Sequence, residues 1–209
     1  MRLQLAVDAP EHLALIPRLA RYVDIIEVGT PVLKRFGASA ISTALELGGG
    51  RTVLADTKTV DGGALEARMA FGAGAAMITV LAHAAPATHE ATRVVAGELG
   101  GEVVFDTILD GEFDAAALRT GDDAGGVWLA LHSPSDARVA GAGDEAHIER
   151  VTARRAAGFR VSLAGGIGRA NLPRVLEARP DVVVVGSAVT AAADPEAEAR
   201  WIRDAMDRA

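Results

Sequence analysis

Short apolar runs alternate with longer amphipathic stretches along the chain, and this alternation occurs eight times. Each apolar run is four or five residues long, and most are rich in valine, isoleucine and leucine. Continuous apolar runs of this length are typical of parallel strands that are buried on both faces. The eight predicted strands cover residues 3–7, 24–28, 52–55, 77–81, 102–105, 127–131, 160–163 and 181–185.

The stretches between the predicted strands have the spacing of amphipathic helices. The clearest of them cover residues 11–22, 61–71, 88–99, 145–156, 169–177 and 195–208. Pro10, Pro86 and Pro195 lie near the starts of three of these helices, where the missing N–H of proline costs little. Alternating strands and helices predict a parallel sheet, either open or closed into a barrel.

Eight strand–helix units favour a closed (β/α)8 TIM barrel over an open sheet. A chain of 209 residues is close to the lower limit of roughly 200 for this fold, so insertions must be few. We expect one domain over residues 1–209, with loop excursions at residues 121–126 and 133–143. Chemistry in such a barrel lies at the C-terminal ends of the strands.

Composition and charge narrow the classes of function. The chain has no cysteine, which excludes disulfides, thiolate metal sites and a catalytic thiol. A net charge of −7 without a basic stripe argues against nucleic-acid binding, and it means that a phosphate site must be local. Asp8 interrupts the first apolar run too early for a secretory signal, and no run reaches the roughly 18 residues of a membrane span. We therefore expect a cytoplasmic protein.

The densest charged cluster, DTKTVD at residues 56–61, follows the third predicted strand. In extended backbone Asp56 and Lys58 point to the same side, and Asp61 lies at the start of the next helix. Flanking carboxylates keep a lysine charged and direct it toward a developing oxyanion. The alternative is an ordinary helix start with Asp61 as its cap and Lys58 in solvent. The position directly after a buried barrel strand favours a catalytic cluster.

Glu27 interrupts the second apolar strand with an acid. A buried carboxylate is costly unless a cation compensates it, so Glu27 needs either a lysine or a metal ion. Glu27 and Asp56 lie on adjacent strands at similar depth and could share one divalent ion. Oxygen ligands favour Mg²⁺, which keeps waters that substrate oxygens can replace. A Glu27–Lys58 salt bridge without a metal is the alternative.

Two histidines follow predicted strands. His132 comes directly after the sixth strand, where it could act as a general acid or base near neutral pH or serve as a structural residue. His83 follows the fourth strand and is equally consistent with a loop position. The histidines on predicted helices, His12, His89 and His147, are expected at the surface.

Glycine-rich segments follow the last two strands. Glycines at these positions let backbone N–H groups approach a phosphate, which provides a local anion site on an acidic protein. A phosphorylated small molecule is therefore the predicted class of substrate. Together with two acids at other strand ends, the expected substrate contacts are Asp8, Asp106, Gly165, Gly166, Gly186 and Ser187.

In this order, these residues resemble the orotidine 5′-monophosphate decarboxylase suprafamily, most closely its 3-hexulose-6-phosphate synthase branch. The D-x-K-x-x-D element formed by Asp56, Lys58 and Asp61 is common to the suprafamily. The resemblance implies a barrel of the ribulose-phosphate-binding type. It runs nearly end to end, through residues 3–8, 23–31, 53–67, 79–81, 164–166, 185–189 and 194–195.

An acid at Glu27 resembles the Mg²⁺-dependent branch of the suprafamily. In that branch the acids matching Glu27 and Asp56 bind Mg²⁺, and the residue matching Lys58 contacts the reaction intermediate. The residue matching His132 moves protons. The acid matching Asp61 reaches the active site of the neighbouring subunit, which implies a homodimer with shared active sites.

The resemblance implies a Mg²⁺-dependent aldol condensation of D-ribulose 5-phosphate with formaldehyde through a 1,2-enediolate. The related 3-keto-L-gulonate-6-phosphate decarboxylases (KGPDC) form a similar enediolate and are the first alternative. They carry arginine where this chain has Ser135 and Ser187, and both differences favour the synthase. Residues 82–85 and 132–135 depart from the synthase pattern, which leaves the identity of the substrate open.

Two further alternatives belong to other classes. A metal-independent epimerase or isomerase barrel would not need Glu27 and would retain activity in EDTA. A non-catalytic sugar-phosphate-binding barrel would be expected to have lost Lys58 or one of its acids, whereas this chain has all of them.

Overall fold

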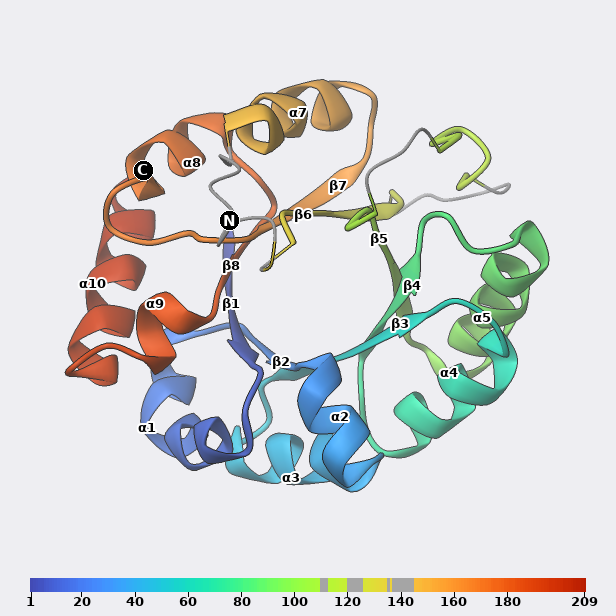
Figure 1. Cartoon of the computed structure of the whole chain (residues 1–209), viewed down its shortest axis with the longest axis horizontal. Coiled ribbons are helices and arrows are strands. Elements are labelled where there is room, and N and C mark those ends of the chain that lie inside the picture. The colour runs from blue at the N-terminus through green and yellow to red at the C-terminus, as the bar shows by residue number, and fades with distance from the viewer. Residues whose placement is uncertain (110–112, 120–125, 135, 137–144) are drawn as a thin grey trace.

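The computed structural model describes residues 1–109, 113–119, 126–134, 136 and 145–209. Eight parallel strands close into a barrel in chain order, with helices arranged around the outside (Figure 1). Because β1 pairs with both β2 and β8, the ring is complete, and the (β/α)8 TIM barrel expected from the sequence is confirmed. The strands are β1 (Arg2–Val7), β2 (Ile25–Val28), β3 (Thr52–Thr59), β4 (Met77–Leu81), β5 (Glu102–Asp106), β6 (Trp128–His132), β7 (Arg160–Ala164) and β8 (Val182–Val185).

The helices lie between the strands, as the amphipathic stretches predict. Pro10, Pro86 and Pro195 begin η1, α5 and α10, as expected. Within the described ranges, none of the helices is both long and apolar enough to cross a membrane. The helices are η1 (Pro10–Leu15), α1 (Ile16–Leu19), η2 (Ala20–Tyr22), α2 (Thr30–Phe36), α3 (Ser39–Leu47), α4 (Gly63–Gly72), α5 (Pro86–Leu99), α7 (Glu145–Ala156), α8 (Leu172–Ala178), α9 (Ser187–Thr190) and α10 (Pro195–Asp207).

Some details of the helices differ from the prediction. Residues 11–22 form three short helical segments instead of one helix, because Pro17 has no N–H to continue the hydrogen-bond ladder. The helices α2 and α3 were not predicted. His89 is buried and not at the surface: its Nε2 lies 2.9 Å from the carbonyl oxygen of Leu81, and its ring packs edge-on against Phe105.

Two apolar layers explain the continuous apolar runs. One layer lies between the strands and the helices and includes Leu3 and Leu5 of β1. The other fills the barrel interior with alternate strand residues such as Ile25 and Met77. A strand with both faces buried needs no polar alternation. Near the C-terminal ends of the strands, the residues that face the barrel interior include small ones such as Ala6. Because small side chains do not fill the interior, a cavity opens there.

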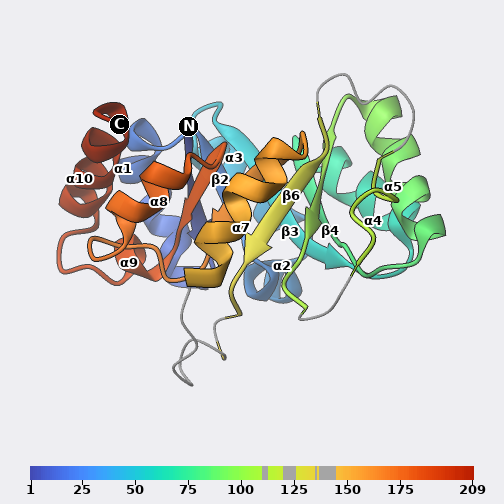
Figure 2. The same ribbon diagram turned by 90° about the horizontal axis from the view of Figure 1, so that it is seen from above.

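The two chain termini lie together at the end of the barrel where the strands begin (Figure 2). The predicted loop excursions fall mainly outside the described residues. Of residues 121–126 only Gly126 is described, and of residues 133–143 only Ser133, Pro134 and Asp136 are described.

Candidate active site

A cavity of about 820 Å³ opens at the C-terminal ends of the strands, and all eight strands contribute to its wall. One lysine and one histidine face several carboxylates in this cavity, so negative charge is in excess among the described lining residues. The ionisable lining residues are Asp8, Glu27, Asp56, Lys58, Asp106, His132 and Asp136.

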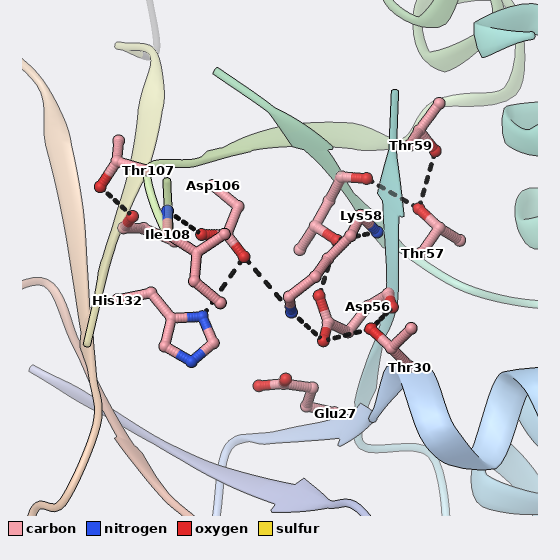
Figure 3. Close-up of polar contacts among 12 residues, drawn as sticks. Glu27, Thr30, Asp56, Thr57, Lys58, Thr59, Asp106, Thr107, Ile108 and His132 are labelled. Atoms are coloured by element: carbon pink, nitrogen blue, oxygen red, sulfur yellow. Dashed lines mark hydrogen bonds and ion pairs between the residues drawn. The ribbon is translucent and has the colours of Figure 1, made fainter. Parts of the chain in front are cut away.

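Lys58 lies between two carboxylates from different strands (Figure 3). Its Nζ is 2.5 Å from Oδ2 of Asp56 on β3 and 3.4 Å from Oδ2 of Asp106 on β5. Burial acts to lower the pKa of Lys58, but the charges of Asp56 and Asp106 outweigh it and raise that pKa. Lys58 is therefore held as an ammonium group inside the cavity.

The backbone of β3 is irregular where these residues lie. The register with β4 shifts between Ala55 and Thr59, and Lys58 has a left-handed φ of 47°. Oγ1 of Thr79 on β4 accepts a hydrogen bond from Lys58 N at 2.9 Å and donates one to Asp56 Oδ1 at 2.8 Å. Asp56 and Lys58 face the same cavity as predicted, although the backbone between them is not regular extended chain.

Thr30, the first residue of α2, also contacts Asp56. Its Oγ1 lies 2.6 Å from the carbonyl oxygen of Asp56 and 2.9 Å from Oδ2, so its one proton serves either acceptor. Thr30 and Thr79 were not among the predicted site residues. Thr30 follows the end of β2 by two residues, and Thr79 is a polar residue in the middle of the apolar run of β4, and these positions were the available signal in the sequence.

Asp106 connects Lys58 to His132. His132 Nδ1 lies 3.3 Å from Asp106 Oδ2, and the backbone N–H of Ile108 donates to Asp106 Oδ1 at 2.8 Å. Burial acts to raise the pKa of Asp106, but the hydrogen bond from His132 and the nearby positive charges outweigh it and lower that pKa. Asp106 is thus an ionised carboxylate that orients His132 toward the cavity.

Glu27 on β2 lies beside Asp56, which is on the adjacent strand β3 (Figure 3). Its Oε2 accepts a hydrogen bond of 2.5 Å from Nε2 of Gln4. Burial and the negative charge of Asp56 raise the pKa of Glu27 to about 8. In the described part of the chain no ion pair joins Glu27 to Lys58, so the predicted alternative of a direct salt bridge between them does not form.

The carboxylates around Glu27 form an oxygen-rich corner of the cavity. Burial and the charge of Asp56 also raise the pKa of Asp8. Among the described residues no group of three or more His, Cys, Asp or Glu side chains is arranged to hold a metal. Mg²⁺, however, commonly takes one or two carboxylates and completes its shell with water and substrate oxygens. The pair Glu27 and Asp56 fits such a site.

The predicted glycine segments line the cavity at the ends of β7 and β8. Gly165 and Gly166 have φ values of 116° and 61°, a backbone conformation that favours glycine. Gly186 immediately precedes Ser187, the first residue of α9. The two segments therefore lie side by side across the β7–β8 pair, as a shared phosphate site requires.

Three predicted residues lie elsewhere. Asp61 is exposed, does not line the cavity, and accepts a hydrogen bond from Gly62 N at 2.8 Å. Gly62, and not Asp61, is the N-cap of α4, so the alternative of Asp61 as a helix cap is wrong. His83 packs edge-on against Phe113 at 5.5 Å and is not part of the cavity wall. Ser135 is outside the described residues.

Comparisons with known proteins agree with this geometry. The chain is 34% identical to the 3-hexulose-6-phosphate synthase of Mycobacterium gastri over 209 residues, covering 99% of this chain and 100% of that one. It superposes on the 3-hexulose-6-phosphate synthase of Salmonella typhimurium with a TM-score of 0.89 at 39% identity, covering 100% and 99% of the two chains. The TM-score is also 0.89 for a ligand complex of KGPDC from Streptococcus mutans, at 27% identity and coverage of 99% and 97%.

These relatives are lyases that share one barrel, so their equal TM-scores identify a common scaffold and do not separate their reactions. Residues 1–202 match the family described as "Orotidine 5'-phosphate decarboxylase / HUMPS family". The chain therefore belongs to the orotidine 5′-phosphate decarboxylase / HUMPS family and is an enzyme of the lyase class.

Proposed function

We propose that this enzyme is a Mg²⁺-dependent aldolase that condenses D-ribulose 5-phosphate with formaldehyde, as the resemblance to 3-hexulose-6-phosphate synthases implies. The observation that carries the proposal is the chain of contacts from Asp56 through Lys58 and Asp106 to His132 inside one cavity. The identity of 39% to a synthase against 27% to a KGPDC, at equal TM-scores, also favours the synthase reaction.

In the proposed reaction His132 removes a proton from C1 of the ketose. The contact between Nδ1 and Asp106 favours the tautomer that carries its proton on Nδ1, which leaves the lone pair on Nε2 as the base. The ammonium group of Lys58 stabilises the negative charge of the resulting 1,2-enediolate. C1 then bonds to the carbon of formaldehyde, and the former aldehyde oxygen takes up a proton to become a hydroxyl group.

Glu27 and Asp56 are the residues that would hold Mg²⁺. When bound, the ion supplies a Lewis acid for the oxygens of the substrate. Two features support this assignment: the excess of carboxylates in the cavity, and the burial of Glu27 beside Asp56, which raises the pKa of Glu27 and which a shared cation would offset. Asp56 keeps its orientation through the hydroxyl groups of Thr30 and Thr79.

The phosphate group is assigned to Gly165, Gly166, Gly186 and Ser187. Backbone N–H groups next to glycine can approach a phosphate without a side chain in the way. Such dipoles act locally, which suits a chain of net charge −7. The substrate would then extend from the β7–β8 end of the cavity toward Lys58 and His132.

We also propose that the enzyme is a homodimer in which Asp61 completes the partner's active site. Asp61 is exposed and does not line the cavity of its own chain. It is flanked by an apolar patch formed by Val60, Leu65 and Met69, which are 61%, 77% and 44% exposed. Exposed apolar side chains beside a functional acid are typical of a protein interface.

A substrate panel with and without Mg²⁺ tests the reaction. Ribulose 5-phosphate with formaldehyde, 3-keto-L-gulonate 6-phosphate and orotidine 5′-monophosphate are offered separately, in Mg²⁺ or in EDTA. We expect formaldehyde to be consumed only with ribulose 5-phosphate and Mg²⁺. Activity in EDTA would contradict the metal assignment, and CO₂ release would contradict the aldol assignment.

Asp56→Ala and Lys58→Ala should each abolish turnover while the circular dichroism spectrum stays that of the folded barrel. Near-normal activity of either variant would overturn the assignment.

Mixing Asp56→Ala chains with Asp61→Ala chains tests the shared site, because one of the two sites in a mixed dimer then has both acids. Some activity should return on mixing, and none should return if Asp61 serves its own chain.

The second candidate is decarboxylation of a keto-sugar phosphate. The scaffold shared with KGPDC, at a TM-score of 0.89, accommodates this reaction, and the enediolate chemistry would use the same lysine and histidine. Against it stands Ser187, which follows the glycine at the end of β8 where those enzymes carry arginine.

A further inference from the structure

A second hollow lies at the opposite end of the barrel, where the strands begin. Two adjoining cavities of about 810 and 500 Å³ share Arg155, Arg160, Arg179 and Asp181 in their walls. Arg2 also lines the smaller cavity. We refer to this region, formed by these five residues and Trp128, as the arginine hollow. Both chain termini lie at the same end of the barrel (Figure 2).

Four arginines outnumber the two acidic side chains of the cavity walls, Glu177 and Asp181, so the arginine hollow is locally basic on a protein of net charge −7. Arg155 pairs with Asp181 at 3.3 Å and Arg160 pairs with Glu102 at 2.7 Å. Among the described residues, no acidic side chain lies within ion-pair distance of Arg2 or Arg179. Two guanidinium groups are thus left without a carboxylate in a concave site.

Trp128 lines the arginine hollow and stacks against two of its arginines. It is 3% exposed and lies at the start of β6, pointing into the barrel. The guanidinium carbons of Arg160 and Arg2 are 3.8 and 5.0 Å from the centre of its ring. Such stacking uses the faces of the guanidinium groups and leaves their N–H edges for acceptors.

The hollow also has a surplus of hydrogen-bond donors. In the described part of the molecule, Nη2 of Arg2 and Nε1 of Trp128 are buried and have no acceptor. Buried donors normally have a partner, so a surplus beside a cavity indicates a missing acceptor. A ligand rich in acceptor oxygens would supply it.

The backbone of Arg179 is a further sign of function. It follows α8 with φ 54° and ψ 55°, a left-handed position where helices usually place glycine. An arginine kept in a strained conformation next to other arginines suggests that its charge is needed there.

We propose that the arginine hollow binds a multiply charged phosphate group, such as a pyrophosphate or a phosphate monoester of a small molecule. Guanidinium groups bind phosphate oxygens through paired N–H donors. A multiply charged phosphate group therefore suits Arg2 and Arg179 better than a monovalent anion does. The site is separate from the active-site cavity, because the lining residues of the two do not overlap.

Fluorescence of Trp128 provides the test, since the chain has only two tryptophans. In a Trp201→Phe background, inorganic pyrophosphate is added at constant ionic strength. We expect a saturable change in emission that sodium chloride does not reproduce. Arg179→Gln should weaken binding at least tenfold, whereas Arg68→Gln, a matched change on α4, should not alter it.

Two more variants keep the outcome decisive. Arg179→Gly removes the charge and suits the left-handed backbone, so it should fold at least as well as the parent and still bind weakly. Ser187→Asp places a carboxylate in the proposed phosphate site of the active-site cavity and should leave the Trp128 response unchanged. A response that survives Arg179→Gln but is lost in Ser187→Asp, or one that sodium chloride reproduces, would overturn the proposal.

Discussion

At the scale of single residues, the hydroxyl group of Thr79 determines how Lys58 is presented. It is the acceptor for the backbone N–H of Lys58, which has a left-handed φ, and a donor to Asp56, so one side chain contacts both residues. A non-glycine residue with positive φ persists only where its surroundings favour it. Thr79 is therefore expected to position Lys58 without contacting the substrate's reacting atoms itself.

Thr79→Val keeps the shape of the side chain and removes both hydrogen bonds. We expect kcat to fall by about 10-fold to 100-fold because the ammonium group is misplaced. The free energy of unfolding should fall by about 1–3 kcal/mol because buried partners are left unpaired. Thr79→Ser, which keeps the hydroxyl group, should retain most of the wild-type kcat and most of the free energy of unfolding. Steady-state kinetics and urea unfolding measure the two effects, and an unchanged kcat in Thr79→Val would contradict the positioning role.

Glu27 makes the stability of the metal-free protein depend on pH. Its pKa rises from the ordinary 4.5 to about 8 on folding, so between these values the folded state holds a proton that the unfolded state has lost. Stability should therefore fall as pH rises from about 4.5 to 8, by at most about 1.4 kcal/mol per pH unit from this group.

Urea unfolding in EDTA at several pH values checks this expectation. Glu27→Gln cannot ionise, so its curve should lose the slope that Glu27 contributes and lie above the wild-type curve near pH 8. Mg²⁺ should raise the stability of the wild type more at pH 8 than at pH 6, because the ion competes with the proton. Parallel curves for the wild type and Glu27→Gln would show that Glu27 does not carry the effect.

At the scale of elements, α4 and the end of β3 are important because they present Asp61 and the apolar patch together. Leu65 on α4 is 77% exposed, the largest value among the exposed large apolar side chains of the described residues. Leu65→Glu should convert the proposed dimer to a monomer and reduce activity at least tenfold, while the barrel stays folded. Light scattering coupled to gel filtration measures the mass.

Leu99→Glu at the end of α5 is the matched control. Leu99 is also exposed, but it lies at the far end of a different helix and should tolerate the charge without loss of assembly. If Leu65→Glu remains a dimer with full activity, the interface is not on α4.

The elements themselves could largely be predicted. All eight strands lie where the apolar runs place them, with ends shifted by one residue in most cases. The largest difference is β3, which continues to Thr59 and carries Asp56 and Lys58 within the strand. Hydrophobic periodicity cannot indicate such a continuation, because polar residues that face a cavity look like the residues of a loop.

At the scale of the whole molecule, the closed ring of strands makes each unit depend on its neighbours. β1 and β8, from opposite ends of the chain, pair through residues such as Leu3 and Val183. We propose that residues 1–209 form one domain, and we expect a single cooperative unfolding transition.

Two probes test cooperativity. Far-ultraviolet circular dichroism reports all helices, and tryptophan fluorescence reports Trp128 inside the barrel and Trp201 on α10. The two transitions should coincide in urea, and single-tryptophan variants should give the same midpoint once any change in stability is accounted for. Separate transitions would indicate two folding units.

The sequence by itself determined the barrel, the order of its elements and the grouping of Asp56, Lys58, Asp106 and His132 at the C-terminal side of the sheet. These features follow from local periodicity and from the rule that parallel strands present their C-terminal ends together. The comparisons then established the family.

Only the tertiary structure decided how these groups contact one another. The left-handed backbone of Lys58 is hydrogen-bonded to Thr79, 21 residues away along the chain, and the raised pKa of Glu27 depends on burial and on Asp56 of the next strand. The arginine hollow likewise joins residues from both ends of the chain. Such contacts depend on strand register and on burial after the barrel closes, and a linear pattern of apolar and polar residues does not specify either of them.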